Sequence, residues 1–213
     1  MKSHCTALLL ATVLILSACQ GGSGNADNPV TAAVKAASDG IDEAQKGMDQ
    51  AKEELEKERA KLNTQNLSLN RDDAHKDLPK AEITPQGELL IDGKAVAATP
   101  EQKQLVLAYR GQMLGVISAG IAVGIEGAKI GMDAAGAALK GLISNKSEDE
   151  IGKEVEAKAK ARLQPEVEKL CARLPGLYAA QQSLADKMPE FRPYATMDKD
   201  DIDDCKDGGD WEP

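Results

Sequence analysis

Aromatic residues are scarce in this chain of 213 residues, which contains one Trp, three Tyr and one Phe. Because β-sandwiches and barrels fill their half-buried faces with aromatic and β-branched side chains, this shortage argues against both folds. Basic residues are also outnumbered, 26 against 35 acidic ones, and the formal net charge is −9. Nucleic-acid binding needs a clustered basic patch, and none is visible. We therefore expect no nucleic-acid partner and a mainly α fold, since Ala, Leu, Glu, Lys and Gln dominate.

Recognisable catalytic and cofactor motifs are lacking as well. Histidine occurs only at His4 and His75, and no glycine-rich phosphate loop, nucleophile elbow or paired-His metal motif is present. Residues 198–203 (DKDDID) resemble the start of a calcium loop, but the glycine at the sixth position and the glutamate at the twelfth are missing. We expect a protein that is not an enzyme, with no cofactor and no metal site.

The N-terminus is typical of an exported bacterial protein. Residues 7–16 carry no charge and are apolar except for Thr12. This run is about half of the roughly 20 residues that a membrane-spanning helix needs. A basic start, a short apolar run and small residues after it are typical of a secretory signal. Residues 16–19 (LSAC) resemble the lipobox of bacterial lipoproteins, in which Cys19 becomes the acylated first residue. The alternative is an ordinary signal peptide with a Cys near its cleavage site.

Acylation at Cys19 would anchor the protein to a membrane permanently, because several acyl chains bind far more stably than one. Gln20 follows this Cys, and in lipoproteins of this kind a residue other than Asp there implies sorting to the outer membrane. The expected organisation is a signal peptide over 1–18 and a flexible tether over 19–29, with a mean reach of about 17 Å. A helical periplasmic domain over 30–195 and an acidic, disordered tail over 196–213 follow.

Two cysteines remain after processing, Cys171 and Cys205. In an oxidising periplasm such a pair favours a disulfide. Two unpaired thiols, or pairing between two molecules, are the alternatives.

The first half of the domain combines one long helix with a small β-meander. Residues 30–62 show apolar positions at alternating steps of three and four, a coiled-coil pattern of about four heptads. A helix packed on its own domain is favoured over an intermolecular coiled coil. Residues 63–80 lack periodicity and predict a loop. Turn signals at 85–87 and 92–93 predict three short strands over 81–97.

The next helix is expected to begin after Thr99, where residues 99–102 (TPEQ) form a capping box with Pro at the first helical position. Residues 111–125 within it carry no charge. Glycine weakens a helix, so a glycine stripe at heptad spacing implies close approach of another backbone. The stripe predicts a helix-packing interface at Gly120, Gly124, Gly127 and Gly131.

Three interpretations of this stripe remain open. A helix contact inside the domain is favoured, and an interface in a homo-oligomer is the second. Insertion into a membrane is the third, and Glu126, Lys129 and Asp133 oppose it because charges are costly in lipid.

The last helices are delimited by a second capping box and by prolines. Ser147 and Glu150 begin a helix that we expect to run to about Leu163. Pro165 is expected to kink or interrupt it, and residues 175–176 (PG) mark another break. The expected fold is therefore long antiparallel helices with a small three-stranded β-meander.

Parts of this pattern resemble the YggN-type family of bacterial envelope proteins of unknown function. The matching features are the hairpin at 83–89 (ITPQGEL), the turn at 92–94 (DGK), the helix start at 99–102, and residues 170–174 (LCARL) followed by 177–184. The resemblance covers about residues 81–185. It implies an envelope location and carries no catalytic residues over.

The favoured hypothesis is an outer-membrane lipoprotein on the periplasmic face, acting through a protein partner as an envelope scaffold or accessory component. An immunity or inhibitor lipoprotein that neutralises a periplasm-targeted effector by charge complementarity is the alternative. A cell-wall hydrolase is disfavoured because the necessary chemistry is missing.

Overall fold

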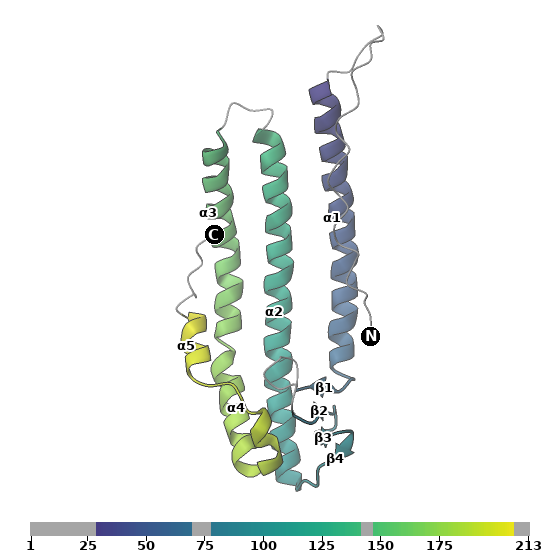
Figure 1. Ribbon diagram of the computed structural model, residues 1–213, viewed down its shortest axis with the longest axis vertical. Helices are drawn as coiled ribbons and strands as arrows, with labels where there is room; N and C mark the ends of the chain where they lie inside the picture. Colours follow the sequence, from purple (N-terminus) through teal and green to yellow (C-terminus); the bar gives the residue numbers. More distant parts are fainter. Residues whose placement is uncertain (1–28, 70–77, 142–146, 207–213) are drawn as a thin grey trace, which may run out of the picture.

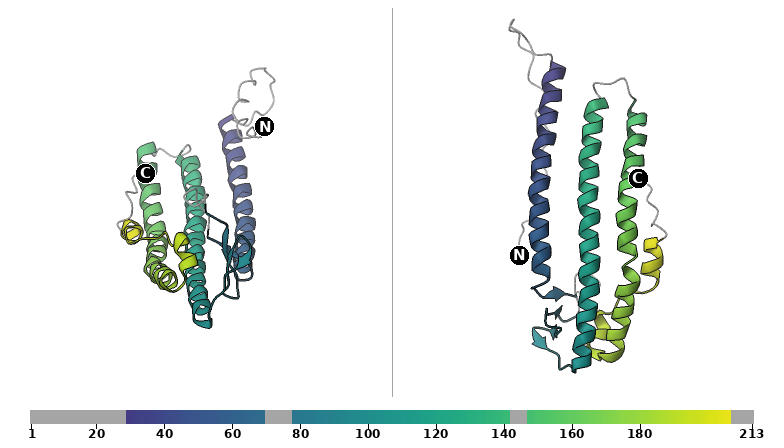
Figure 2. Two further views of the ribbon diagram at one scale, coloured as in Figure 1. Left: turned by 60° about the horizontal axis from the view of Figure 1, so that its bottom comes forward. Right: turned by 180° about the vertical axis from the view of Figure 1, so that it is seen from behind.

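The computed structural model describes residues 29–69, 78–141 and 147–206. Three long helices lie in one row, each antiparallel to its neighbour (Figure 1). Helix α1 spans Pro29–Leu62, α2 spans Pro100–Gly141 and α3 spans Glu148–Cys171. Helix α2 is central and contacts both others, and the view from behind shows the same row (Figure 2). The predicted mainly α fold with long antiparallel helices is confirmed.

The strands and the helical segment that follows α3 gather at one end of this row, and the last short helix lies beside α3 (Figure 1). The strands are β1 (Leu67–Ser68), β2 (Ala81–Ile83), β3 (Leu89–Ile91) and β4 (Lys94–Ala95). The C-terminal elements are α4 (Leu174–Lys187), the 3₁₀ helix η2 (Pro189–Tyr194) and α5 (Asp200–Lys206). The sheet is antiparallel in the order β1-β2-β3-β4. Three strands were expected, and the fourth, β1, comes from the segment predicted as a loop. Leu67 of β1 pairs with Ile83 of β2 and is fully buried.

The turn between β2 and β3 presses against the first turns of α2. Gly87 has φ +80°, and a Cβ added there would lie 2.7 Å from Cγ of Leu107 and 2.9 Å from the carbonyl oxygen of Lys103. Only glycine adopts this conformation and leaves this space without strain. The turn is closed because the amide of Glu88 donates to Oγ1 of Thr84 at 3.1 Å. The hairpin predicted from the sequence therefore also docks the sheet on α2.

The hydrophobic core lies between this sheet, the first turns of α2, α4 and η2. Its buried residues are Ala81, Ile83, Leu89, Val106, Tyr109, Leu184, Ala185, Met188, Phe191 and Tyr194. The rings of Tyr109 and Phe191 meet edge to face, with centroids 5.1 Å apart, a favourable geometry for aromatic pairs. Burial raises the pKa of Tyr109 to about 12. Its phenol is therefore a neutral part of the core.

Arg110 links three separate segments at the edge of this core. Its side chain is buried, and its guanidinium donates to the carbonyl oxygens of Leu62 at 2.6 Å, Gln65 at 2.8 Å and Ile83 at 3.2 Å. The carbonyl of Leu62 ends α1 and has no partner inside the helix. A cation at a helix C-terminus is also favourable electrostatically. Burial lowers the pKa of Arg110, but a guanidinium stays charged in proteins.

Helix α1 rests lightly on the rest of the protein. Val34, Ile41 and Met48 are half-buried at intervals of seven residues, Leu55 at the next such position is exposed, and Leu62 at the end of the helix is half-buried. None of the described side chains of α1 is fully buried. These residues place the predicted apolar seam beside α2, as the favoured interpretation of a helix packed on its own domain requires.

Both predicted capping boxes are confirmed. The amide of Gln102 donates to Oγ1 of Thr99, whose own amide donates back to Oε1 of Gln102. Ser147 and Glu150 make the same reciprocal pair at the start of α3. The predicted break near Pro175 is also confirmed, since this residue lies at the start of α4.

The expected end of α3 near Leu163 is wrong. Pro165 lies inside the helix, which continues to Cys171. Proline removes the donor to the carbonyl four residues earlier, at Ala161. Both residues are exposed, so water can hydrogen-bond that carbonyl, while Leu163 is buried against the helix's neighbours.

Replacing Arg110 with Met should lower the free energy of unfolding by about 3 kcal/mol, because three carbonyl oxygens then lose a buried donor. Urea denaturation followed by circular dichroism measures this. Arg59→Met is the control, since Arg59 forms an exposed pair with Glu56, and surface pairs contribute at most about 1 kcal/mol. Equal unfolding midpoints for the two variants would contradict the role of Arg110.

Candidate functional site

The two predicted disulfide partners are joined in the structure. The sulfur atoms of Cys171 and Cys205 lie 2.01 Å apart and their Cα atoms 5.6 Å apart. Cys171 is the last residue of α3, and Cys205 lies in α5. The bond therefore fastens the C-terminal helix to the side of α3.

The expectation of a disordered tail from residue 196 onward is wrong as far as Lys206. Gln181 is 2% exposed, and its amide group donates to the carbonyl of Met197 at 2.7 Å and accepts from the amide of Met197 at 3.2 Å. Asp198 accepts from the amides of Asp200 and Asp201 at the start of α5. Composition suggested disorder, but these hydrogen bonds, the disulfide and the buried Ile202 hold the segment. Residues 207–213 lie outside the described part.

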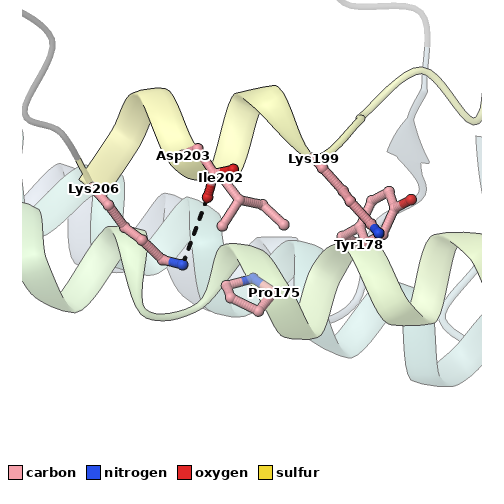
Figure 3. Close-up of a pocket in the computed structure, with 6 residues that line it drawn as sticks. All are labelled: Pro175, Tyr178, Lys199, Ile202, Asp203 and Lys206. Atoms are coloured by element: carbon pink, nitrogen blue, oxygen red, sulfur yellow. Dashed lines mark ion pairs between the residues drawn. The ribbon is translucent and has the colours of Figure 1, made fainter.

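A hollow of about 240 Å³ lies where α5 meets α4, lined by Pro175, Tyr178, Lys199, Ile202, Asp203 and Lys206 (Figure 3). Lys206 pairs with Asp203 at 3.9 Å. The volume is below the range of about 300–1,000 Å³ that small-molecule sites occupy. Over residues 29–69, 78–141 and 147–206, no three His, Cys, Asp or Glu side chains are placed to hold a metal ion.

The side of α2 that faces α3 carries an ion-pair cluster. Nε of Arg162 donates to Oε1 of Glu126 at 2.6 Å, and Arg162 also pairs with Asp133. Lys129 lies 3.1 Å from the other carboxylate oxygen of Glu126. Hydrogen bonds from Lys129 and Arg162 lower the pKa of Glu126, although desolvation opposes them. The charges within the apolar helix therefore fix its alignment with α3.

Helix α2 is long and apolar enough to span a membrane when judged by length and composition alone, and it is the one described helix with this property. Two of its charged residues, Glu126 and Asp133, pair with Arg162 of α3 in this structure. The interpretation of membrane insertion would require these ion pairs to separate in lipid, where charges are costly.

The predicted glycine stripe is uncovered. Gly120, Gly124, Gly127 and Gly131 are exposed, and a Cβ added to any of them would meet nothing within 4 Å. The favoured interpretation, a close helix contact inside the domain, is therefore wrong. The physical reason is rotational: Gly127 follows Glu126 and so points about 100° away from the side that contacts α3.

Other glycines make the close contacts. A Cβ at Gly115 would lie 3.0 Å from Nη1 of Arg173, and one at Gly176 would lie 2.8 Å from Oε1 of Gln112. Gly141 is crowded by Ile151. These three positions pack α2 against α3 and α4, and none belongs to the residues chosen from the sequence as the interface.

Sequence reasoning missed three residues that organise the fold: Arg110, Arg162 and Gln181. Each is a polar residue that reaches a segment far away in the chain. Only Arg110 could have been noticed in the sequence, because it is a charged residue directly after the apolar residues in the first turns of α2. Cys19 and His75 lie outside the described residues.

No family model, no curated protein and no solved structure matches this chain. The resemblance to the YggN-type family stays a prediction.

Replacing Glu126 with Gln should change how stability depends on pH. Because the folded-state pKa of Glu126 is lowered, its ionised form stabilises the fold above the unfolded-state pKa, and this contribution disappears as pH falls through the folded-state value. The variant should be less stable than the wild type near pH 7 and lose less stability on acidification below about pH 5. Thermal unfolding at a series of pH values measures both effects.

Glu156→Gln, at an exposed position on α3, is the matched control and should leave the pH profile unchanged. Parallel pH profiles for wild type and the Glu126 variant would show that the cluster contributes nothing to stability.

Proposed function

We propose that this chain is an outer-membrane-anchored periplasmic lipoprotein that acts without catalysis, as an envelope scaffold or a protein-binding accessory component. The lipobox-like residues 16–19 and the following Gln20 support the anchor. The disulfide between Cys171 and Cys205 supports an oxidising compartment, because such bonds persist in the periplasm and are rare in the cytosol.

The observation that carries this proposal is the length of α1, which separates the N-terminal end of the described chain from the core. Helix α1 begins at Pro29, at the end of the row opposite the sheet and α4 (Figure 1). Its 34 residues correspond to a length of about 51 Å at 1.5 Å per residue. A tether at Cys19 would therefore hold the core end tens of ångströms from the bilayer, as a spacer does.

The surface of the molecule also suits protein contacts. Most side chains of α1 are exposed, and the glycine-rich side of α2 is uncovered. An elongated molecule of this kind offers large open faces, whereas the hollow near Ile202 is small. Open faces suit a scaffold, because protein interfaces are broad and small-molecule sites are concave.

Replacing Cys19 with Ser should remove the anchor. The wild-type protein should carry acyl chains on Cys19 and sediment with outer membranes, while the variant should be unacylated and soluble, since no other lipid attachment is expected. Mass spectrometry of the N-terminal peptide and membrane fractionation measure both. Cys5→Ser is the matched control and should remain acylated, because this residue leaves with the signal peptide. An unmodified Cys19 in the wild type would contradict the proposal.

The ordered acidic helix α5 favours a second candidate function, inhibition of a basic partner. Asp200, Asp201, Asp203 and Asp204 are exposed on a segment that the disulfide fixes. A fixed acidic surface can bind a basic protein by charge complementarity, as an immunity protein binds an effector.

Replacing Asp200 and Asp204 with Asn should then weaken binding of a partner co-purified with the wild type and reduce the salt dependence of that binding. Glu53→Gln with Glu54→Gln, on exposed positions of α1, removes the same charge elsewhere and should have no such effect. Salt titration of the purified complex measures it. Identical salt dependence in both double variants would exclude α5 as the binding surface.

A further inference from the structure

We propose that the disulfide between Cys171 and Cys205 is a redox switch, which a dithiol protein reduces to release α5 and which oxidation resets. Its state decides whether the acidic helix α5 is fixed against α3 or detached from the folded body. The switch needs neither the lipid anchor nor the binding partner proposed above, because it depends only on how this one segment is attached.

Few non-covalent contacts hold α5 to the rest of the molecule. Ile202 is its one buried residue, and this side chain points toward Pro175 of α4 (Figure 3). Among the described residues, the ion pair of α5 joins Lys206 to Asp203 of the same helix, so it makes no connection to another element. The helix has seven residues, and isolated helices shorter than about 12–15 residues are marginal in water. The disulfide is therefore the main attachment of α5.

The rest of the molecule is held together without α5. In the described part of the chain, the hydrophobic core takes its buried residues from the sheet, α2, α4 and η2, and none from α5 or the last turn of α3. Helix α3 is aligned with α2 separately, because Arg162 pairs with Glu126 and Asp133. Reduction should therefore release one segment and leave the body folded. A disulfide that staples a small core differs, since its removal often abolishes folding.

The segment that moves has a defined beginning. Gln181 is 2% exposed and binds both the amide and the carbonyl group of Met197. The next residue, Asp198, accepts from the amides of Asp200 and Asp201, which belong to the moving segment itself. The chain as far as Met197 can therefore stay in place while the residues after it detach. The fixed and the released state differ in this short stretch alone.

The charges of α5 favour release once the disulfide is reduced. Asp200 and Asp204 are exposed and lie four residues apart on the helix, a spacing at which like charges repel. Asp204 also lies in the last turn, where the helix dipole disfavours a negative charge. The disulfide therefore holds in place a short helix that its own charges destabilise.

Cys205 is the half of the disulfide that another protein can reach. Cys171 is 5% exposed, whereas Cys205 is half-buried and lies between the exposed residues Asp204 and Lys206. Helix α5 lies on the outer side of α3, at the edge of the row (Figure 1). Access helps to decide which sulfur of a disulfide a thiolate attacks. The geometry therefore makes Sγ of Cys205 the site of attack.

The exchange takes place in two steps that balance. A thiolate of the dithiol protein attacks Sγ of Cys205, a mixed disulfide forms, and Cys171 leaves as a thiolate that takes a proton from water. The second thiolate of the reductant then attacks the reductant's own sulfur in the mixed disulfide, and Cys205 leaves as a thiolate that is protonated in turn. Two electrons pass to this chain, which gains two thiols, and the reductant becomes a disulfide. The reverse exchange fixes α5 again.

Hydrogen exchange followed by mass spectrometry tests the switch on the full mature chain. Reduction with dithiothreitol should raise the exchange rates of the amides of residues 202–206 by about tenfold or more, because this segment opens locally. The rates in α2, α4 and the strands should not change. Reoxidation with oxidised glutathione should restore slow exchange in α5. Unchanged exchange in α5 after reduction, or faster exchange in α2 and α4 as well, would overturn the proposal.

Two variants separate the disulfide from the apolar contact. Cys171→Ala with Cys205→Ala keeps α5 released, so its exchange should be fast with or without dithiothreitol and the rest of the chain should exchange as in the wild type. Ile202→Ala is the matched control, because it removes the buried side chain of α5 and keeps the disulfide. This variant should stay slow until it is reduced. Release of α5 by Ile202→Ala without reduction would overturn the proposal.

Trapping identifies the sulfur that is attacked. Thioredoxin with its second active-site cysteine replaced by serine can perform only the first step, and iodoacetamide added at once alkylates the sulfur that leaves. Peptide mapping should find thioredoxin on Cys205 and the alkyl group on Cys171. The opposite arrangement, or no mixed disulfide at all, would overturn the assignment.

Two further outcomes distinguish this inference from the proposed function. A membrane-bound wild-type chain whose disulfide resists both dithiothreitol and thioredoxin overturns the switch and leaves the anchor intact. A wild-type chain that is unacylated and soluble but releases α5 reversibly supports the switch and removes the anchor.

Discussion

The buried guanidinium of Arg110 is the interaction on which the arrangement of the long helices depends. It binds the end of α1, the following turn and strand β2 from a position in α2. Helix α1 has few other strong attachments, since its apolar seam is only half-buried. A charged group with three carbonyl partners has one favourable geometry, so it fixes where α1 leaves the core. The direction of α1 relative to the core follows from this joint.

The two ends of the molecule are held by different kinds of contact. At the sheet end, apolar side chains from the strands, α2, α4 and η2 form the core. Toward the other end, α2 and α3 are aligned by Arg162 with Glu126 and Asp133 and by the contact of Gly141 with Ile151. Ion pairs fix alignment well but bury little apolar surface. This division leaves one face of α2 uncovered while Glu126, Lys129 and Asp133 are paired.

Sequence motifs predicted the structure correctly wherever contacts between residues close in the sequence form it. The capping boxes at Thr99 and Ser147, the hairpin turn and the start of α4 at Pro175 all depend on contacts within a few residues. Predictions failed where distant contacts decide the outcome. Strand β1 forms because Leu67 pairs with Ile83 of β2. The acidic segment before Lys206 is ordered because Gln181 hydrogen-bonds to Met197 and Cys171 forms a disulfide with Cys205.

The sequence by itself determined the helical class, the boundaries marked by caps and prolines, and the existence of a glycine stripe with heptad period. Only the tertiary structure decided that this stripe faces outward. Periodicity shows which residues share one side of a helix, but it contains no information about where the neighbouring helices lie. That was decided by Arg110, which sets α1 on one side of α2, and by Arg162, which aligns α3 on the other.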